Sequence, residues 1–457
     1  MQDGEVGMLI DFSFANYRSF KQEQSFSMTR ERRFNDGTFG ELSTICAVYG
    51  ANASGKSNFL RALWTMCEMV RNSYGQGHTS SAIPRNPFID PVRGRNEPSM
   101  FLCEFIASDD QRYRYWFRFN DETIIEEELV VYRLLPEGRR SSHASRLFTR
   151  EGSKMDFGPS FRGPRAQVRK TLELRPNALL LSTAAAAGIE SITPAFEFLA
   201  YGISFCDASG YADEQERIVN EFNRKTAFAG YLSQLIRYAD FGIDAVRSAP
   251  VSIDDGIKDA FKQQLREQLG ADESKLEQLF AANSGTQLVF DHTLGEGIAT
   301  LLMGDESRGT IAALSFFSLV LHQLTKSTIT LVDEIDTSLH PTLVRELVSL
   351  FVDPLTNPKR SQLIFTTHDT SLINVSGSSV RIIGADQTWL VEKLRNGESE
   401  IYPVTDMHVR TEENIGRNYL NGVYGGVPKP DFHTTFARII DEIETSTYTP
   451  TTEEAVA

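Results

Sequence analysis

The stretch Gly50–Ser57 reads "GANASGKS" and fits the pattern G-x-x-x-x-G-K-[ST]. It follows the apolar run "STICAVYG", which favours a strand, and precedes "NFLRALWTMCEMV", which favours a helix. Glycines in such a loop let the backbone wrap a phosphate with its N–H groups pointing inward. We therefore predict the phosphate loop of an ATPase, with Lys56 on the β- and γ-phosphates and Ser57 on Mg²⁺. The loop residues expected to bind ATP are Gly50, Asn52, Ser54, Gly55, Lys56, Ser57 and Asn58.

Two carboxylates end a second apolar stretch, "TITLVDEID" (328–336). Apolar and β-branched residues precede Asp333 and Glu334, so the pair is expected at the end of a buried strand. Two adjacent carboxylates there would be costly in a purely structural role. We expect Asp333 to bind Mg²⁺ through water and Glu334 to orient or deprotonate the attacking water. The simpler alternative is an ordinary turn after a strand.

A histidine ends a third apolar stretch, "LIFTTHD" (363–369). This stretch predicts a buried strand beside the acidic one in a parallel sheet. His368 would then lie where it can touch the γ-phosphate and sense its loss. A lone histidine is more often structural, and the order of the motifs is what favours the functional interpretation.

A second helix start that could meet an anion follows at "DESRGT" (305–310). Ser307 stands where a polar turn gives way to a long apolar-periodic run, and Gly309 lets a backbone come close. The N-terminus of a helix attracts anions through its free N–H groups and its dipole. The alternative is an ordinary helix cap, which this sequence also satisfies.

Composition and charge narrow the class of protein. The chain has 457 residues, of which 41% are hydrophobic and 23% charged, as in ordinary globular proteins. The sequence contains no run of about 18 apolar residues, which is the length that would indicate a membrane span. The first residues lack a signal-peptide pattern. The four cysteines are scattered without a C-x-x-C, so we expect buried thiols in a reducing cytosol.

The net charge of −15 argues against a surface uniformly suited to nucleic acid. The stretch Arg133–Arg175, however, holds eleven Lys and Arg against four acids. It could contact DNA or RNA, or it could be a solvated loop that pairs with the protein's own acidic groups.

The motif order resembles that of ABC-type ATPases: phosphate loop, insertion, Ser/Gly helix start, acidic strand, histidine strand. "MLIDFSFANYRSF" followed by "GANASGKSNFLRAL" resembles the opening of RecF, SMC and overcoming-lysogenization-defect (OLD) ATPases. "DESRGT", "LVDEIDTSLHP", "TTHD", "DQTWLVEK" and "YLNGVYGGVP" resemble RloA-type and abortive-infection (AbiL-type) ATPases of bacteria.

This resemblance implies an α/β fold: a mixed sheet with flanking helices, an antiparallel β lobe and a helical insertion. It implies a homodimer, or higher homo-oligomer, in which Ser307 and Gly309 close on the ATP held by a second protomer. Asp336 would make a contact across that dimer. The resemblance also implies a cytoplasmic role in anti-phage defence, beside a separately encoded partner, commonly a nuclease.

The expected organisation has four parts. They are an N-terminal ATPase lobe (1–189), a helical insertion (190–285), a C-terminal ATPase lobe (286–440) and an acidic, disordered tail (441–457). The insertion is too short for the long coiled-coil arm of SMC proteins, and we could not place a Q-loop glutamine in the sequence.

Three functions remain open. The first is an ATP-driven sensor or scaffold subunit of a defence complex, and the second is a RecF-like DNA-repair ATPase that binds DNA itself. The third, a self-contained nuclease of the OLD type, would need a D-x-D motif after His368, which the sequence lacks. A transporter's ATPase subunit fits less well, because the "NYRSF" opening and "DEIDTSLHP" are not its usual forms.

Overall fold

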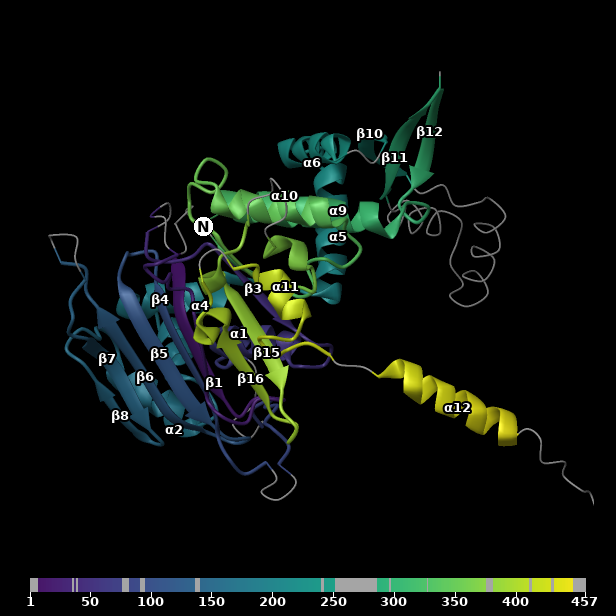
Figure 1. Cartoon of the computed structure of the whole chain (residues 1–457). Coiled ribbons are helices and arrows are strands. Elements are labelled where there is room, and N and C mark those ends of the chain that lie inside the picture. The colour runs from purple at the N-terminus through teal and green to yellow at the C-terminus, as the bar shows by residue number, and fades with distance from the viewer. Residues whose placement is uncertain are drawn as a thin grey trace, which may run out of the picture.

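The computed structural model describes most of the chain and shows three sheets with helices between and around them (Figure 1). The described residues are 7–34, 37, 40–75, 82–90, 95–135, 140–239, 242–250, 286–295, 297–326, 328–374, 381–410, 413–428 and 431–446.

A six-stranded sheet forms the centre of the molecule. In spatial order its strands are β16 (Ser399–Pro403), β15 (Thr388–Lys393), β3 (Ile45–Gly50), β14 (Gln362–Thr366), β13 (Ile329–Val332) and β9 (Ile203–Cys206). All neighbours are parallel except β15 and β16. Every residue of β3, β13 and β14 is buried, as expected for strands covered on both faces. The three strands predicted from the motifs are therefore confirmed, and β14 lies between the other two.

The described part of the chain contains ten α-helices. They are α1 (Lys56–Asn72), α2 (Arg165–Leu174), α3 (Leu180–Ala186), α4 (Thr193–Tyr201), α5 (Ala208–Asn223), α6 (Ala227–Tyr238), α9 (Arg308–Lys326), α10 (Pro341–Val352), α11 (Ile415–Leu420) and α12 (Phe432–Ser446). None of them is both long and apolar enough to cross a membrane.

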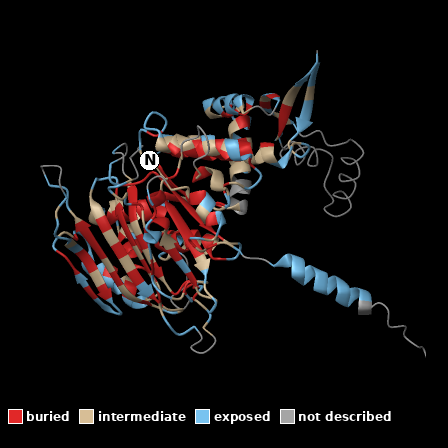
Figure 2. Cartoon of the chain, in the orientation of Figure 1, coloured by how far each residue is buried: buried red, intermediate tan, exposed pale blue. Residues whose placement is uncertain are grey.

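Alternate residues of β3 belong to two different hydrophobic clusters, because side chains of a strand point to opposite faces. Cys46 and Val48 pack with α1 and the larger antiparallel sheet. Ala47 and Tyr49 pack with α9, α10 and α11 on the other face. Figure 2 shows the resulting buried interior at the centre of the molecule.

A seven-stranded antiparallel sheet confirms the predicted β lobe. Its strands, in spatial order, are β2 (Gln24–Ser27), β1 (Met8–Ala15), β4 (Ser99–Ile106), β5 (Arg112–Phe119), β6 (Ile124–Tyr132), β7 (Ser145–Glu151) and β8 (Lys154–Phe157). Within this sheet, β4, β5 and β6 form a meander, and β7 and β8 form a hairpin.

A buried acid joins this lobe to α3. Glu127 accepts hydrogen bonds from the Tyr115 hydroxyl at 2.8 Å and from the backbone N–H groups of Leu180 and Leu181. Arg150, itself 2% exposed, lies 3.9 Å from the same carboxylate. Burial raises the pKa of Glu127, and Arg150 acts against that shift. The carboxylate thus caps the first turn of α3 from inside the β lobe.

The expected helical insertion of residues 190–285 differs from the structure. The segment is helical at α4, α5 and α6, but "ISFC" within it forms β9 at the edge of the central sheet. β10 (Ile243–Pro250) pairs with β11 (Thr286–Leu294), which pairs with β12 (Gly297–Leu302). A four-residue apolar run between helices gives no period that could identify β9 as a strand. Residues 251–285 lie outside the described residues.

The expected disordered tail also needs correction at its start. Residues 441–446 belong to the helix α12, and residues 447–457 lie outside the described residues.

Candidate nucleotide-binding site

The predicted phosphate loop connects β3 to α1, and two of its glycines are required by close contacts. A Cβ on Gly50 would lie 2.4 Å from the carbonyl oxygen of Val391. A Cβ on Gly55, whose φ is +120°, would lie 2.8 Å from the Ser399 hydroxyl. Ser54 is buried, and its hydroxyl has no partner among the described residues. The loop is therefore tightly curved and keeps a free hydroxyl, which suits a phosphate ligand.

Lys56 begins α1 and turns its ammonium back over the loop. Its Nζ donates to the carbonyl oxygens of Gly50 and Ala51, at 2.9 and 3.1 Å. It also lies 3.2 Å from Nε2 of His368. Burial lowers the pKa of Lys56, and the neighbouring carboxylates oppose that shift. Burial, and then the Lys56 charge, lower the pKa of His368, so a neutral imidazole can accept the lysine's hydrogen bond.

The Ser57 hydroxyl and the Asp333 carboxylate meet at the end of β13. Ser57 Oγ donates to Asp333 Oδ1 at 3.1 Å. A serine hydroxyl and a carboxylate are hard oxygen ligands, which suit Mg²⁺ when phosphates and water complete its shell. The residues present therefore fit the Mg²⁺ that the sequence predicts, and the chain would hold it through Ser57 and Asp333.

Thr366, at the end of β14, is a positioning residue that the sequence analysis missed. Its hydroxyl donates to Asp333 Oδ1 at 2.7 Å and accepts from the backbone N–H of Glu334 at 2.7 Å. One side chain thus orients the predicted metal ligand and the predicted catalytic carboxylate together. Thr366 is the first threonine of "TTHD", and its role could have been predicted only if β13 and β14 were known to be neighbours.

Glu334 leaves the sheet with a φ of +55°, an uncommon value for a residue other than glycine. Its side chain is exposed and lines a cavity of about 520 Å³ together with Asp333, Gly304 and Arg308. Backbone conformations of this kind cluster at functional sites, where surrounding structure holds them. Here the Thr366 hydroxyl holds the Glu334 backbone.

Asp336 contacts the histidine segment of its own chain. Its Oδ2 accepts a hydrogen bond from the backbone N–H of His368 at 3.2 Å, while Oδ1 is buried without a hydrogen-bond partner in the described structure. The expected contact across a dimer stays a prediction.

The helix start at Ser307 is capped in the ordinary way. Ser307 Oγ accepts from the backbone N–H of Thr310 at 3.0 Å, which is the capping geometry considered as the alternative. A Cβ on Gly309 would lie 3.0 Å from the carbonyl oxygen of Ser338, so packing within the chain also favours glycine there. In the described part of the chain no hydrogen bond joins Ser307 or Gly309 to the phosphate loop. Their action on another chain's ATP stays a prediction.

The turn "NYRS" supports the phosphate loop from outside. The Asn58 amide donates to the Ser19 hydroxyl at 2.9 Å, and Arg18 Nη1 donates to Asn58 Oδ1 at 3.3 Å. Asn16 and Arg18 both have a positive φ, of 52° and 49°. The sequence analysis used this turn only for the family resemblance and assigned no role to Arg18 or Ser19. Asn52, another predicted nucleotide-binding residue, is exposed in the loop.

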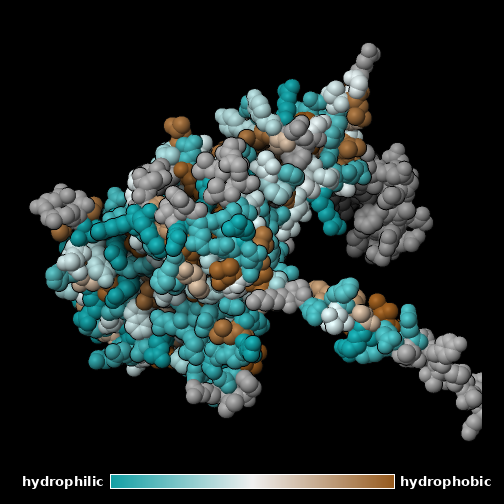
Figure 3. Space-filling model, in the orientation of Figure 1, coloured by the Kyte–Doolittle hydropathy of each residue, from teal (hydrophilic) through white to brown (hydrophobic). Residues whose placement is uncertain are grey.

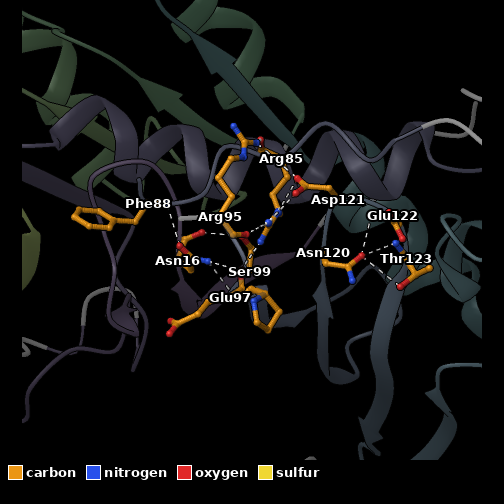
Figure 4. Close-up of polar contacts among 11 residues, drawn as sticks. Asn16, Arg85, Phe88, Arg95, Glu97, Ser99, Asn120, Asp121, Glu122 and Thr123 are labelled. Carbon is orange, nitrogen blue, oxygen red and sulfur yellow. Dashed lines mark hydrogen bonds and ion pairs between the residues drawn. The ribbon is translucent and has the colours of Figure 1, made fainter. Parts of the chain in front are cut away.

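A buried arginine fixes the loop that holds this turn (Figure 4). The Arg85 side chain, 1% exposed, forms two hydrogen bonds of 3.0 Å with Asp121 and also donates to the carbonyl oxygens of Arg95 and Glu97. Asn16 donates to the same Glu97 carbonyl at 2.7 Å. The phosphate loop is therefore supported through Asn16 and Arg85 by the β lobe.

An ion pair joins the phosphate-loop helix to β9. Arg61 Nη2, one turn after Ser57, lies 2.5 Å from Asp207 Oδ2. Asp207 follows Cys206, whose carbonyl oxygen accepts from the Asp333 backbone N–H at 2.9 Å. The sequence analysis missed Asp207 because it did not identify β9.

Comparison with known proteins identifies one family. The family model described as "AAA domain, putative AbiEii toxin, Type IV TA system" matches residues 45–374, well over half of the chain. No curated protein matches the chain.

Two of the solved structures that match the chain do so at low identity and with low TM-scores. The first is an Smc head domain with an extended coiled coil, bound to the C-terminal domain of ScpA, from Pyrococcus furiosus. It shares 13% identity, with a TM-score of 0.32, over 96% of this chain and 100% of that one. The second is the recombination mediator protein RecF with ATP, at 14% identity and a TM-score of 0.34, over 87% and 98%.

Removing the Lys56 ammonium, which is expected to bind the phosphates, should affect the reaction differently from removing the Glu334 carboxylate, which is expected to act on the attacking water. Lys56→Ala should weaken ATP binding roughly 10- to 150-fold, because a hydrogen bond to a charged group contributes about 1.5–3 kcal/mol. Glu334→Gln should keep ATP binding but lower kcat roughly 10²–10⁴-fold. Binding is measured by titration calorimetry and turnover by phosphate release. Glu346→Gln, an exposed acid on α10, is the matched control. A parental rate in Glu334→Gln would refute the assignment of Glu334.

Thr366→Val should raise the Mg²⁺ concentration needed for half-maximal hydrolysis, because Asp333 loses one of its two hydrogen bonds and the Glu334 backbone N–H loses its acceptor. An unpaired buried group costs about 1–3 kcal/mol, so turnover at limiting Mg²⁺ should fall roughly tenfold. Thr366→Ser keeps the hydroxyl and should behave like the parent. The measurement is ATPase rate against Mg²⁺ concentration. Equal Mg²⁺ dependence of the Val and Ser variants would contradict a positioning role.

Proposed function

We propose a function for this chain from one premise: it belongs to the AAA-domain family described as putative AbiEii toxin of a Type IV TA system, and it is an ATP-hydrolysing enzyme. In our proposal, the chain is the ATP-driven sensor or scaffold subunit of a bacterial anti-phage defence complex. A separately encoded effector, a nuclease, does the damage.

One observation carries the enzymatic part of this proposal. Asp333 Oδ1 accepts hydrogen bonds from both Ser57, on the phosphate-loop helix, and Thr366, on β14. Lys56 and His368 lie beside the same loop, and Glu334 leaves the sheet next to Asp333. In the proposed reaction Mg²⁺ bound with ATP supplies charge neutralisation. Glu334 orients the attacking water, Lys56 binds the phosphates and His368 contacts the γ-phosphate.

The second part of the proposal is that two copies share each ATP. Ser307 caps α9 by accepting a hydrogen bond from the backbone N–H of Thr310. The backbone N–H groups of Arg308 and Gly309, at the start of the same helix, are left as donors for an anion. Arg308 is exposed and lines the same cavity as Glu334. We propose that this helix start closes on the ATP of a second protomer in a homodimer or larger homo-oligomer, and that Asp336 contributes to that interface.

One feature supports the role in defence: the description of the family names a toxin of a Type IV system. In the proposed complex, nucleic-acid cleavage belongs to another protein, in the cytoplasm.

The alternative is a RecF- or SMC-like ATPase that binds DNA at Arg133–Arg175. Many cations of this stretch have partners within the lobe: Arg150 is buried, and Arg165 and Arg169 donate to backbone carbonyl oxygens. Eight of the ten described cations, Arg165 and Arg169 among them, are nevertheless exposed, so a basic surface remains available. Residues 136–139 of the stretch lie outside the described residues. Nucleic-acid binding at this stretch stays the second candidate function.

Action of Ser307 on a second chain is testable without disturbing the helix cap. Ser307→Asp keeps a good capping oxygen but places an anion against the γ-phosphate, so hydrolysis should fall while ATP binding at Lys56 persists. Ser307→Asn caps equally well and is the neutral control. Mixing Ser307→Asp with Lys56→Ala should restore part of the activity, because one composite site is then intact. The measurement is ATPase rate against mixing ratio. Full activity of Ser307→Asp alone would refute the shared site.

The effector is testable by co-purification from the native host. Glu334→Gln should hold the ATP-bound state and retain a nuclease-like protein that cleaves DNA or RNA. Lys56→Ala should retain less of it, if the ATP-bound state presents the docking surface. The bound proteins are identified by mass spectrometry, and their nuclease activity is assayed directly. Direct, salt-sensitive DNA binding by the purified chain with no co-purifying nuclease would favour the RecF-like alternative instead.

A further inference from the structure

The helix α12 (Phe432–Ser446) lies apart from the rest of the fold. In Figure 1 it projects away from the sheets, and in Figure 2 residues 432–444 have the colour of exposed residues. It follows the last strand of the central sheet, β16, and lies outside the residues that the family model matches. Among the described residues, none of the hydrogen bonds of the candidate nucleotide-binding site involves α12.

One face of α12 is apolar, and its spacing is that of a coiled-coil seam. Phe432, Phe436, Ile439 and Ile443 follow one another at intervals of four, three and four residues, as d and a positions of a heptad do. They are 65%, 56%, 39% and 57% exposed. Ile440, beside them, is 52% exposed. Figure 3 shows hydrophobic atoms on this helix next to hydrophilic ones.

A helix of this length needs a partner to be stable. Isolated helices of about 12–15 residues are marginal in water even for alanine-rich sequences, and α12 contains several β-branched residues. A partly exposed Phe or Ile offers on the order of 100 Å². The four seam residues of two copies would therefore bury about 800 Å² together, and Ile440 of each copy brings the total to about 1,000 Å². That area is at the lower limit for a specific interface, which suits an element tethered to a larger body.

The charges of α12 select among possible partners. Residues 431–446 hold four acids and one arginine. A membrane-surface helix would carry Lys and Arg on its polar face, and a nucleic-acid contact would need cations. The positions that border the seam are His433, Thr435, Ile440 and Glu442, so only one of them is acidic. Arg438 pairs with Glu442 at 2.8 Å.

We propose that α12 is a self-association helix whose apolar seam, defined by Phe432, Phe436, Ile439 and Ile443, packs against the same seam of a second copy of this chain. The seam is complementary to itself, and its borders bring no two acids of different copies face to face. This contact is separate from the proposed interface at which two copies share each ATP. It would hold two copies together before nucleotide binds, which raises the effective concentration at which their ATPase heads meet.

The first test is the oligomeric state of the full chain without nucleotide. Analytical ultracentrifugation should show a dimer for the parent and for Lys56→Ala, because the contact does not use ATP. The double variant Phe436→Asp/Ile439→Asp should be monomeric. Thr434→Asp/Ala437→Asp adds the same charges away from the seam and should stay dimeric. A monomeric parent, or a dimeric seam variant, would overturn the proposal.

The second test identifies the contact directly by cross-linking. The four native cysteines are buried, so a single introduced cysteine can be modified selectively. If the two helices are parallel, Phe436→Cys alone should give covalent dimers with a short bis-maleimide. If they are antiparallel, a mixture of Phe436→Cys and Ile439→Cys should give them. Thr434→Cys is the matched control on the opposite face. Equal cross-linking of the control, or none by the seam cysteines, would show that α12 packs elsewhere. ATP binding by each variant reports that the ATPase remains folded, so this outcome is independent of the proposed function.

Discussion

A single carboxylate oxygen, Oδ1 of Asp333, connects the segments on which the rest of the site depends. It accepts hydrogen bonds from Ser57 and from Thr366, which belong to α1 and β14. The backbone N–H of the same residue donates to β9 through Cys206. Parallel strands end at one edge of a sheet, so side chains from distant parts of the chain converge there without long loops. The predicted phosphate, metal and water-activating groups all lie at that edge.

The two lobes contribute differently to this edge. The parallel sheet supplies the acids and the phosphate loop, and it is buried on both faces. The antiparallel lobe supplies support: Arg85 fixes a loop whose backbone holds Asn16, and the turn after Asn16 carries Arg18 and Ser19 to Asn58. A buried arginine must be fully hydrogen-bonded to be tolerated, and its backbone partners make this loop rigid. The N-terminal strand is thereby part of the nucleotide site as well as of the β lobe.

The helix start at Ser307 shows how one local feature can satisfy two demands. Its hydroxyl caps the helix and its glycine allows close packing on Ser338, so both residues are explained within one chain. The N–H groups that the cap leaves unsatisfied still require a partner, and an anion is the natural one. The cap and the proposed contact with another chain's ATP are therefore compatible, since they use different atoms. The helix α12 is the contrasting case, because nothing within the described chain covers its apolar face.

The sequence by itself determined the motifs whose chemistry is contiguous. The loop around Lys56, the paired acids Asp333 and Glu334, and the histidine strand each combine a short apolar run with the polar residues that follow it. The central strands could be predicted for the same reason, whereas the antiparallel lobe was expected from the family resemblance. Only the tertiary structure decided which of these segments are neighbours. The strand β9 is too short to show a period, and the partnerships of Thr366 with Asp333 and of Arg61 with Asp207 join residues far apart in the chain. The order of the strands in this sheet differs from their order in the sequence, with β3 between β15 and β14. Packing of the whole chain decides which strands lie side by side, and no single segment encodes that order, which determines which side chains share the site.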